Sequence, residues 1–506
     1  MNPFSRIKTK FVAADARRLR LHFKKFKTSL RTPTSAAFLV LLLTGCTMIP
    51  QYQRPPADLS ASWPGAPGYT NAETAPAKMP AAEIGWRDFF RDPRLQRTIE
   101  MALTNNPNFR AAVLNVEQSR ALYHVQALAL VPTVNINANG TRQKIPNVFG
   151  GTAKPLTYSE YSANLGVANY EVDLFGHVRS LTRQALETYF ATVEARQSAH
   201  IALVAQVGLA YLSAEEAGEQ LALAQEMLKS ARQAYDLTKR SFDAGVLSQF
   251  DLNNASTQLQ TASAAVAGYA QQLAEASDNL TLLVGRPLPA ELQPSRELNL
   301  EICLSDIPAG LPSDLLARRP DVLQAEHQLK AANANIGAAR AAFFPTITLT
   351  GSAGYSSTAL AELFAPGSTA WGFSPQLVWP IFAGGTAWQG LKAVEAAKSI
   401  AAVNYQAAVH TAFKEVADAL AVRATVQSQL TDDEALVKAD QQSYDLTQAG
   451  FRAGVNSQLD VLVTLQTLDS ARQNLIQAQY SRLVSLINLY QALGGGWNEK
   501  TVQSVK

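Results

Sequence analysis

One 18-residue stretch occurs twice in this chain. Residues 234–251 read AYDLTKRSFDAGVLSQFD, and residues 443–460 read SYDLTQAGFRAGVNSQLD. Each position of the first copy recurs 209 residues later, and farther upstream Asn106-Pro107 and Arg319-Pro320 begin two matching segments at a spacing of 213. Self-similarity over such distances indicates one structural unit used twice. We therefore interpret the chain as a tandem duplication.

The residues around both copies predict very long helices. Proline, which costs ~3 kcal/mol inside a helix, is absent between Leu156 and Arg286 and again after Pro380. Apolar residues recur three and four positions apart in both regions, as in a helix with one buried stripe. We expect helices from about 177 to 242 and from about 386 to 451, each ~100 Å long at ~1.5 Å per residue. Helices of this length bridge a distance and bury their apolar stripe by coiled-coil packing.

Both long helices end in the same way. Gly245 and Gly454 suit a left-handed C-cap, because glycine adopts positive φ without steric cost. Each glycine is followed three residues later by a serine and six residues later by an aspartate, a spacing that predicts a capping box at the start of a second helix. The predicted cap residues are Ser248 with Asp251 and Ser457 with Asp460. The chain therefore turns back at each glycine, and we expect two helical hairpins with similar tips.

The opposite ends of the hairpins carry strand signals. Partial alternation of apolar and polar residues occurs in two pairs of segments, each pair separated by a Gly- and Pro-containing loop: 131–142 with 161–172, and 344–355 with 371–379. At ~10 residues each, these segments have the length of outer-membrane strands. Four strands cannot close a barrel around a channel, and open sheet edges are not tolerated in lipid. Several copies of the chain are therefore expected to contribute strands to one barrel.

The first 45 residues read as an export signal. Ten of the 44 Lys and Arg residues lie within residues 1–31, and the apolar run 36–43 follows. This run is too short for a transmembrane helix, which needs ~20 residues. Leu43-Thr44-Gly45-Cys46 has the form of a bacterial lipobox, in which the cysteine thiol accepts diacylglycerol before cleavage. We predict lipidation of Cys46 and attachment to outer-membrane lipid; the alternative is an ordinary signal peptide with an incidental cysteine.

Composition excludes several classes of function. From Cys46 onward the chain has 34 basic and 40 acidic residues and no basic stripe, which gives no reason to expect nucleic-acid binding. The six histidines are scattered without Cys/His ligand spacing, so we expect no metal site and no cofactor. Neither a phosphate-binding loop nor a nucleophile elbow occurs, and we expect no enzymatic activity. Cys303, the only other cysteine, is expected to be a buried, inert thiol.

These patterns divide the chain into six segments. We assign 1–45 to the signal peptide, 46–92 to a lipid-anchored extended segment, 93–290 to the first structural repeat, 291–318 to an equatorial linker, 319–496 to the second repeat and 497–506 to a C-terminal tail. The expected fold class is mainly α with a β-barrel portion. Each chain supplies long antiparallel helical hairpins and four transmembrane strands.

Seven kinds of short motif, one of them present twice, occur along this duplicated frame. They are Trp86–Leu95, Asp173–Gly176, Arg318–Asp321, Phe344–Thr346, Trp379–Gly385, the two Phe-x-x-Gly tips, and Ala492–Trp497. Together they resemble the TolC-like outer-membrane efflux proteins, in particular the lipid-anchored NodT/OprM-like branch that pairs with resistance-nodulation-division pumps. The resemblance covers essentially the whole mature chain. It implies a homotrimer with a twelve-stranded barrel in the outer membrane and a twelve-helix tunnel through the periplasm.

The resemblance also implies a constriction at the periplasmic entrance. Asp460, six residues after the tip glycine, matches an aspartate that narrows the tunnel in family members. Three carboxylates around a threefold axis would repel one another and attract cations. The alternative reading of Asp460 is the helix cap with Ser457, and one side chain can serve both purposes. Relatives often carry a second acid where this chain has Val463, so Leu459 and Val463 are expected to form an apolar constriction instead.

The tips are the second site that the resemblance implies. Gly245, Val246 and Leu247, and in the second hairpin Gly454, Val455 and Asn456, occupy the positions where the family's tips contact the periplasmic adaptor protein. The simpler interpretation is that the glycines only terminate helices. Helix termination is also compatible with adaptor contact, so one tip can do both.

The expected function is the outer-membrane duct of a tripartite efflux pump, working with a periplasmic adaptor and an inner-membrane resistance-nodulation-division pump. Two alternatives remain open at this point: the exit duct of a type I protein secretion system, and a non-conducting lipoprotein that tethers envelope layers. The exported substrate is not readable, because a passive duct takes its specificity from the pump below it.

Overall fold

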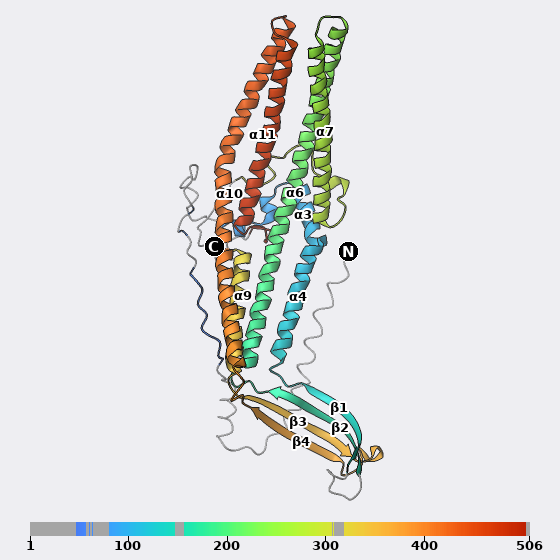
Figure 1. Ribbon diagram of the computed structural model, residues 1–506, viewed down its shortest axis with the longest axis vertical. Coiled ribbons are helices and arrows are strands. Elements are labelled where there is room, and N and C mark those ends of the chain that lie inside the picture. The colour runs from blue at the N-terminus through green and yellow to red at the C-terminus, as the bar shows by residue number, and fades with distance from the viewer. Residues whose placement is uncertain are drawn as a thin grey trace.

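The computed structural model describes residues 47–56, 60, 63, 80–146, 156–305, 307 and 318–501 (Figure 1). A four-stranded sheet lies at one end of an elongated body, two helical hairpin tips lie at the other, and the short helices lie between them. The signal peptide and Cys46 lie outside the described residues. Among the helices that are described, none is both long and apolar enough to cross a bilayer.

The two predicted long helices are confirmed. Helix α6 spans His177–Asp243 and α10 spans Thr386–Arg452, and each has 67 residues. Each is followed after a short turn by an antiparallel partner, α7 (Gln249–Val284) or α11 (Gln458–Ala492). Helices α4 (Pro107–Leu128) and α9 (Pro320–Ala341) are also equal in length, at 22 residues, and each begins with a proline in its first turn, where the missing N–H costs nothing. The duplication in sequence is therefore a duplication in structure.

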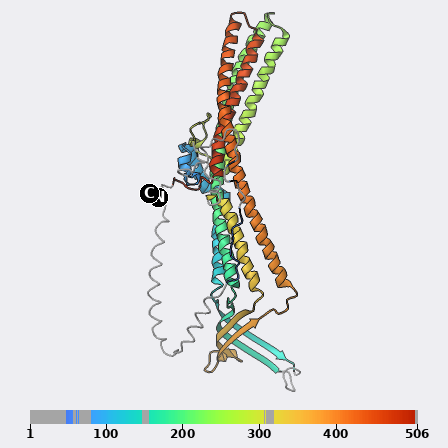
Figure 2. The same cartoon turned by 90° about the vertical axis from the view of Figure 1, so that its left-hand side faces the viewer.

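Short elements complete the body at its middle. They are η3 (Ala81–Glu83), α2 (Trp86–Phe89), α3 (Pro93–Asn105) and η4 (Ala290–Leu292). A further short element, η6 (Leu360–Glu362), lies next to the sheet, between β3 and β4. The main core lies here, where α2 and α3 pack against α6 and α11 (Figure 2). The rings of Phe89 and Tyr490 stack at 3.9 Å, and the Tyr490 hydroxyl donates to the Ile84 carbonyl at 2.7 Å. The N-terminal part and the last helix are thereby fixed to each other.

Cys303 lies in the same core, beside Phe90. It is a free, buried thiol, and burial raises its pKa to about 12. Because only the thiolate is reactive, the prediction of an inert cysteine agrees with this environment.

The four strands form one antiparallel sheet in the order β1-β2-β3-β4. Their bounds are Val134–Ile145, Leu156–Glu171, Thr346–Ser357 and Thr369–Val378. The first predicted strand was placed three residues too early, because the N–H of Val131 donates to Leu128 and closes a turn after α4. The second was placed five residues too late, because residues 156–160 continue the ladder with β1. Pairing between strands, not alternation alone, decides where each strand ends.

A β-bulge separates two registers between β2 and β3. Val167 pairs with Gly351, whereas Tyr170 pairs with Leu349. Asn169 lies between them at φ 52°, and its N–H donates to the Thr350 hydroxyl at 3.1 Å. Asparagine tolerates positive φ better than most residues. The bulge bends β2 where the sheet meets the helical body, and it leaves the polarity of the two faces unchanged.

Candidate functional site

Both hairpin tips have the backbone that the sequence predicts. Gly245 has φ 75° and Gly454 has φ 74°, which is the left-handed conformation that glycine adopts without strain. In the first tip the N–H of Val246 donates to the Ser241 carbonyl at 2.9 Å, and in the second the N–H of Val455 donates to Gly450 at 2.8 Å. Carbonyls in the last turns of α6 and α10 thereby gain hydrogen-bond partners.

A capping box starts the returning helix in each hairpin. The Ser248 hydroxyl accepts from the Asp251 N–H at 3.2 Å, and the Asp251 carboxylate accepts from the Ser248 N–H at 2.9 Å. The corresponding distances for Ser457 and Asp460 are 3.2 and 2.8 Å. The serine hydroxyl also donates to the carboxylate, and these hydrogen bonds lower the pKa of Asp251 and of Asp460. Both aspartates therefore cap their helices as ionised groups.

The apolar residues proposed for the entrance lie on one face of α11. Leu459 and Val463, four positions apart, are both exposed and line a cavity that faces α7. The Asp460 carboxylate is held back at Ser457. One chain therefore brings Leu459 and Val463 together, while Asp460 points to its own helix start.

The exposed tips differ in chemistry. Val246 and Val455 are 76% and 80% exposed, the highest values among the large apolar side chains at the tips. Leu247 and Asn456 occupy equivalent places and are both partly buried. The Asn456 amide donates to the Thr447 carbonyl at 3.3 Å, which a leucine cannot do. Each tip therefore presents an exposed valine next to a different partner.

The sheet has two faces of opposite polarity. Reading the register across all four strands, Ile136 pairs with Leu165, Leu165 with Ala353, and Ala353 with Trp371. The adjacent row consists of Asn135, Gly166, Ser352 and Gly372. Ile136 and Trp371 are each 83% exposed. An exposed apolar face on a sheet marks an interaction with something apolar.

The N-terminal segment 47–56 is attached to α9. Ile49 packs so closely on Gly337 that a Cβ there would lie 2.7 Å from its side chain. The Asn333 amide donates to the Pro50 carbonyl at 2.8 Å, and Arg54 forms an ion pair with the buried Glu326. No motif predicts these contacts, because the partners are separated by more than 270 residues.

The described residues contain no group of three His, Cys, Asp or Glu side chains that could hold a metal ion.

Asp469 is an acidic residue that the sequence analysis did not identify as a candidate. It lies exactly seven residues after Leu462 and seven before Ile476, both of which are buried, so it occupies an apolar position of the heptad. That break in the pattern was the available signal.

Comparisons with known proteins agree with this architecture. The family described as "Outer membrane efflux protein" matches residues 98–286 and 311–495. The toluene efflux pump outer membrane protein TtgC of Pseudomonas putida is 45% identical over 470 residues, which cover 93% of this chain and 96% of that protein. The antibiotic efflux pump outer membrane protein ArpC of Pseudomonas putida is also 45% identical, with the same coverage.

Solved structures show the same fold. The open state of the MtrE outer membrane channel of Neisseria gonorrhoeae has a TM-score of 0.81 and 37% sequence identity, covering 90% of this chain and all of that one. A membrane protein from Pseudomonas aeruginosa has a TM-score of 0.83 and 38% identity, covering 89% of this chain and 100% of that one. These matches confirm the resemblance seen in the sequence motifs, and the chain belongs to the outer membrane efflux protein family.

Proposed function

We propose that three copies of this chain form the outer-membrane duct of a tripartite pump that exports drugs or other small molecules. Family membership makes the chain an efflux protein of the outer membrane. The proposal adds the assembly: a twelve-stranded barrel continuous with a tunnel of twelve helices. Its partners are a periplasmic adaptor and an inner-membrane pump of the resistance-nodulation-division type. The duct is passive, and we propose no enzymatic role.

The single observation that carries this proposal is the two-faced sheet. One face is apolar or small from Val134 to Gly140 and becomes polar only toward the far ends of β1 and β2, whereas the other face is mainly polar or small, as a barrel with lipid outside and water inside requires. Among the described residues, the outer strands β1 and β4 each have an edge that pairs with no other strand. In lipid, such edges need a pairing partner, because each unsatisfied backbone group costs several kcal/mol. Further copies of the chain supply that partner.

The length of the helices supports the same function. Helices α6 and α10, with 67 residues each, are ~100 Å long. They connect the sheet to the tips at the opposite end of the body (Figure 1). If an outer membrane holds the sheet, the tips reach deep into the periplasm. A duct of this length carries substrate across the periplasm without releasing it there.

The names of the relatives favour small molecules as cargo. TtgC is named as part of a toluene efflux pump and ArpC as part of an antibiotic efflux pump. An identity of 45% over nearly the full length supports a similar cargo class for this chain. The alternatives to small-molecule efflux are a duct for protein secretion and a non-conducting envelope tether. Measurements of conductance and of restored resistance distinguish these functions.

We also propose that Cys46 carries lipid. The contacts of Ile49 and Pro50 with the last two turns of α9 bring the chain close to β3, which begins five residues after α9 ends. The described segment 47–56 therefore follows the half of α9 next to the sheet, which supports an anchor in the membrane that holds the sheet. Cys46→Ser should abolish labelling by a palmitate analogue, with Cys303→Ser as the matched control that keeps the label. Label on the Cys46→Ser protein would contradict lipidation.

The tips and the entrance complete the proposal. Gly245, Val246 and Leu247 with Gly454, Val455 and Asn456 form the adaptor contact, and Asp460, Leu459 and Val463 narrow the entrance. The support is geometric: both valines are exposed at the free ends of long hairpins, and Leu459 and Val463 share one face of α11.

Conductance and mass test the function directly. The purified full-length protein should have the mass of a trimer, and it should conduct ions in a planar bilayer. Expressed in a strain that lacks its own efflux ducts, together with an adaptor and pump from the same genome, it should restore resistance to a small toxic compound. A monomeric, non-conducting protein would contradict the duct. A conducting trimer that restores secretion of a protein but no resistance would assign it to protein export.

A further inference from the structure

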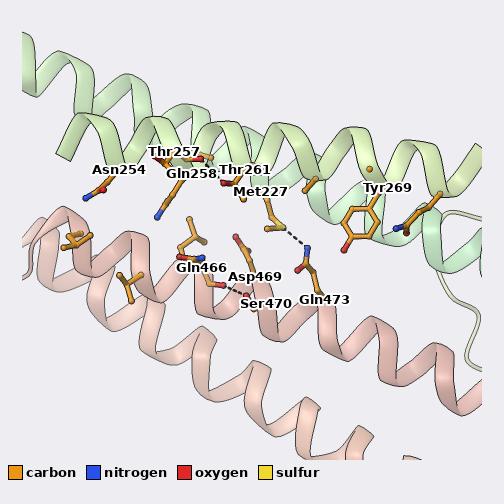
Figure 3. Close-up of a pocket in the computed structure, with 18 residues that line it drawn as sticks. Met227, Asn254, Thr257, Gln258, Thr261, Tyr269, Gln466, Asp469, Ser470 and Gln473 are labelled. Carbon is orange, nitrogen blue, oxygen red and sulfur yellow. Dashed lines mark hydrogen bonds between the residues drawn. The ribbon is translucent and has the colours of Figure 1, made fainter. Parts of the chain in front are cut away.

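A cavity of about 720 Å³ lies between the two hairpins, in their distal half. Helices α6 and α7 form one wall and α11 forms the other, and side chains from both walls point toward one another (Figure 3). The lining is mixed, with amides and hydroxyls next to alanines and leucines. Its volume lies within the ~300–1,000 Å³ typical of small-molecule sites.

Asp469 is the one charged residue among the side chains that line this cavity. It is only 7% exposed. Within the described residues no hydrogen bond to its carboxylate contributes to its electrostatics, although buried carboxylates normally have one, and its oxygens face the open space of the cavity. Nor does packing explain an acid here, because the equivalent heptad places hold Leu462 and Ile476. A buried, unpartnered carboxylate directed into a cavity is the feature that needs an explanation.

The charged residues near Asp469 do not explain why its carboxylate is buried. Arg472, one turn away on α11, donates to the Gln441 side chain of α10 at 2.7 Å and is thus committed to its own hairpin. Glu226 on α6 adds a second negative charge near Asp469. Helix α7 contributes only uncharged residues to the lining. Arg472 acts on Asp469 only from a distance, since no ion pair joins the two within the described residues, and no positive side chain lines the cavity itself.

Two further residues suit a soft, organic cation. The ring of Tyr269 on α7 and the thioether of Met227 on α6 lie in the same lining (Figure 3). Aromatic rings attract cations at their faces, and thioethers pack well against aromatic ligands. A metal ion is disfavoured, since one carboxylate among amides and hydroxyls falls short of the several charged oxygens that hard cations require.

We propose that the cavity between the hairpins binds a drug-sized organic cation, with Asp469 as its counter-ion and Tyr269 as its aromatic wall. The site is distinct from the tips and from the proposed entrance aspartate. It lies on the chain itself, so a full assembly holds one site per chain.

The position of the cavity gives such a ligand a means to act on the duct. The Gln220 amide donates to the Gln473 carbonyl at 3.2 Å, and the Gln473 amide contacts the Met227 sulfur at 3.8 Å, so the hairpins are joined at this level. Leu459 and Val463 line the same cavity. A bound cation would therefore hold the hairpins apart at the residues proposed to narrow the entrance.

Binding should depend on pH in a defined direction. Burial raises the pKa of Asp469 to about 6, with Glu226 raising it and Arg472 lowering it. A cation binds the ionised carboxylate better than the neutral acid. Affinity should thus be constant well above pH 6 and should fall by up to about tenfold per unit below it.

The test uses ethidium, a planar monocation, with the purified full-length assembly and fluorescence anisotropy as the readout. We expect one ethidium per chain, and affinity at least tenfold lower for Asp469→Asn. The matched control is Asp278→Asn, which removes the same charge from an exposed place on α7.

A second variant blocks the cavity and keeps the carboxylate. A Cβ at Gly268 meets no atom within 4 Å, so Gly268→Leu extends into the open space from a helix that accepts leucine well. It should also lose ethidium binding. Wild-type affinity in both Asp469→Asn and Gly268→Leu would overturn the proposal, as would a stoichiometry of one ethidium per three chains.

Discussion

The two hairpin tips have the same backbone but different side chains. At the cap serines, Ser248 has φ −84° and ψ 161° and Ser457 has φ −82° and ψ 161°. The residue before the serine is a leucine in the first tip and an asparagine in the second, Asn456. Six residues earlier, Ser241 in the first tip is replaced by Gly450 in the second.

The two differences are connected. A Cβ at Gly450 would lie 2.8 Å from the Asn456 amide nitrogen, so the glycine makes room for the amide that donates to Thr447. The glycine cap and the capping box determine the backbone, and the remaining positions are free to change in pairs. In a trimer, the two kinds of tip would alternate around the ring of hairpin ends. A partner protein that binds this ring could therefore distinguish one kind of tip from the other.

The largest effect is expected from the residues that the tips share. Gly245→Val and Gly454→Val should each reduce export severely, because a displaced tip loses its adaptor contact. The folding cost should stay near ~1–2 kcal/mol, since a Cβ meets no atom within 4 Å at either glycine and only positive φ opposes it. The measurement is resistance to an exported compound at matched protein abundance.

Gly390→Ala is the control for these glycines. Gly390 lies within α10, and a Cβ there also meets no atom within 4 Å. This change should leave resistance at the wild-type level. Full resistance in both tip variants at normal abundance would show that the tips do not make the proposed contact. A difference between Gly245→Val and Gly454→Val would show which surface the partner uses more.

A second, smaller effect should separate the two cap aspartates. Asp460→Ala and Asp251→Ala remove the same capping box, yet only Asp460 is proposed to face the entrance. In single-channel recordings, Asp460→Ala should weaken block by multivalent cations added from the periplasmic side, because three carboxylates are lost together from a narrow aperture. Asp251→Ala should leave the block unchanged. Equal block in wild type and Asp460→Ala would leave the helix cap as the role of Asp460.

Acid should affect both caps in the same direction. Hydrogen bonds from serine lower the pKa of Asp251 and Asp460 below the ordinary value of 3.8. Their stabilisation is therefore complete above pH ~4 and is lost as the pH falls through the lowered pKa. Hydrogen exchange at the first turns of α7 and α11 should show protection that is constant from pH ~5 to 8. Loss of protection in that range would contradict ionised caps.

The features that sequence predicted are those that depend on neighbouring residues. Absence of proline, helical periodicity and the glycine–serine–aspartate spacing act within a few residues, and they predicted α6 and α10 to within one residue at either end. The features that were missed depend on distant partners. The bulge at Asn169 requires Thr350 on another strand, and Arg54 meets Glu326 only in the folded chain. Asp469 was visible as a broken heptad, but its cavity requires both hairpins.

The smallest effect concerns the paired difference at the tips, and a double-mutant cycle measures it. Gly450→Ser should displace the Asn456 amide, with loss of a hydrogen bond worth about 0.5–1.5 kcal/mol, offset by ~0.5 kcal/mol of better helix propensity for serine. Asn456→Leu should lose the same hydrogen bond. The double change reproduces the side chains of the first tip at these two places, so the losses should not add.

We expect a coupling free energy of about 0.5–1 kcal/mol between positions 450 and 456, measured by thermal unfolding of the full-length protein. Ser241→Gly with Leu247→Asn is the reciprocal exchange in the first tip, and it should couple with the same sign. Additive effects in both tips would mean that the contact between Gly450 and Asn456 carries no energy. The two side-chain differences would then be independent, and each tip surface would have to be explained by its partner alone.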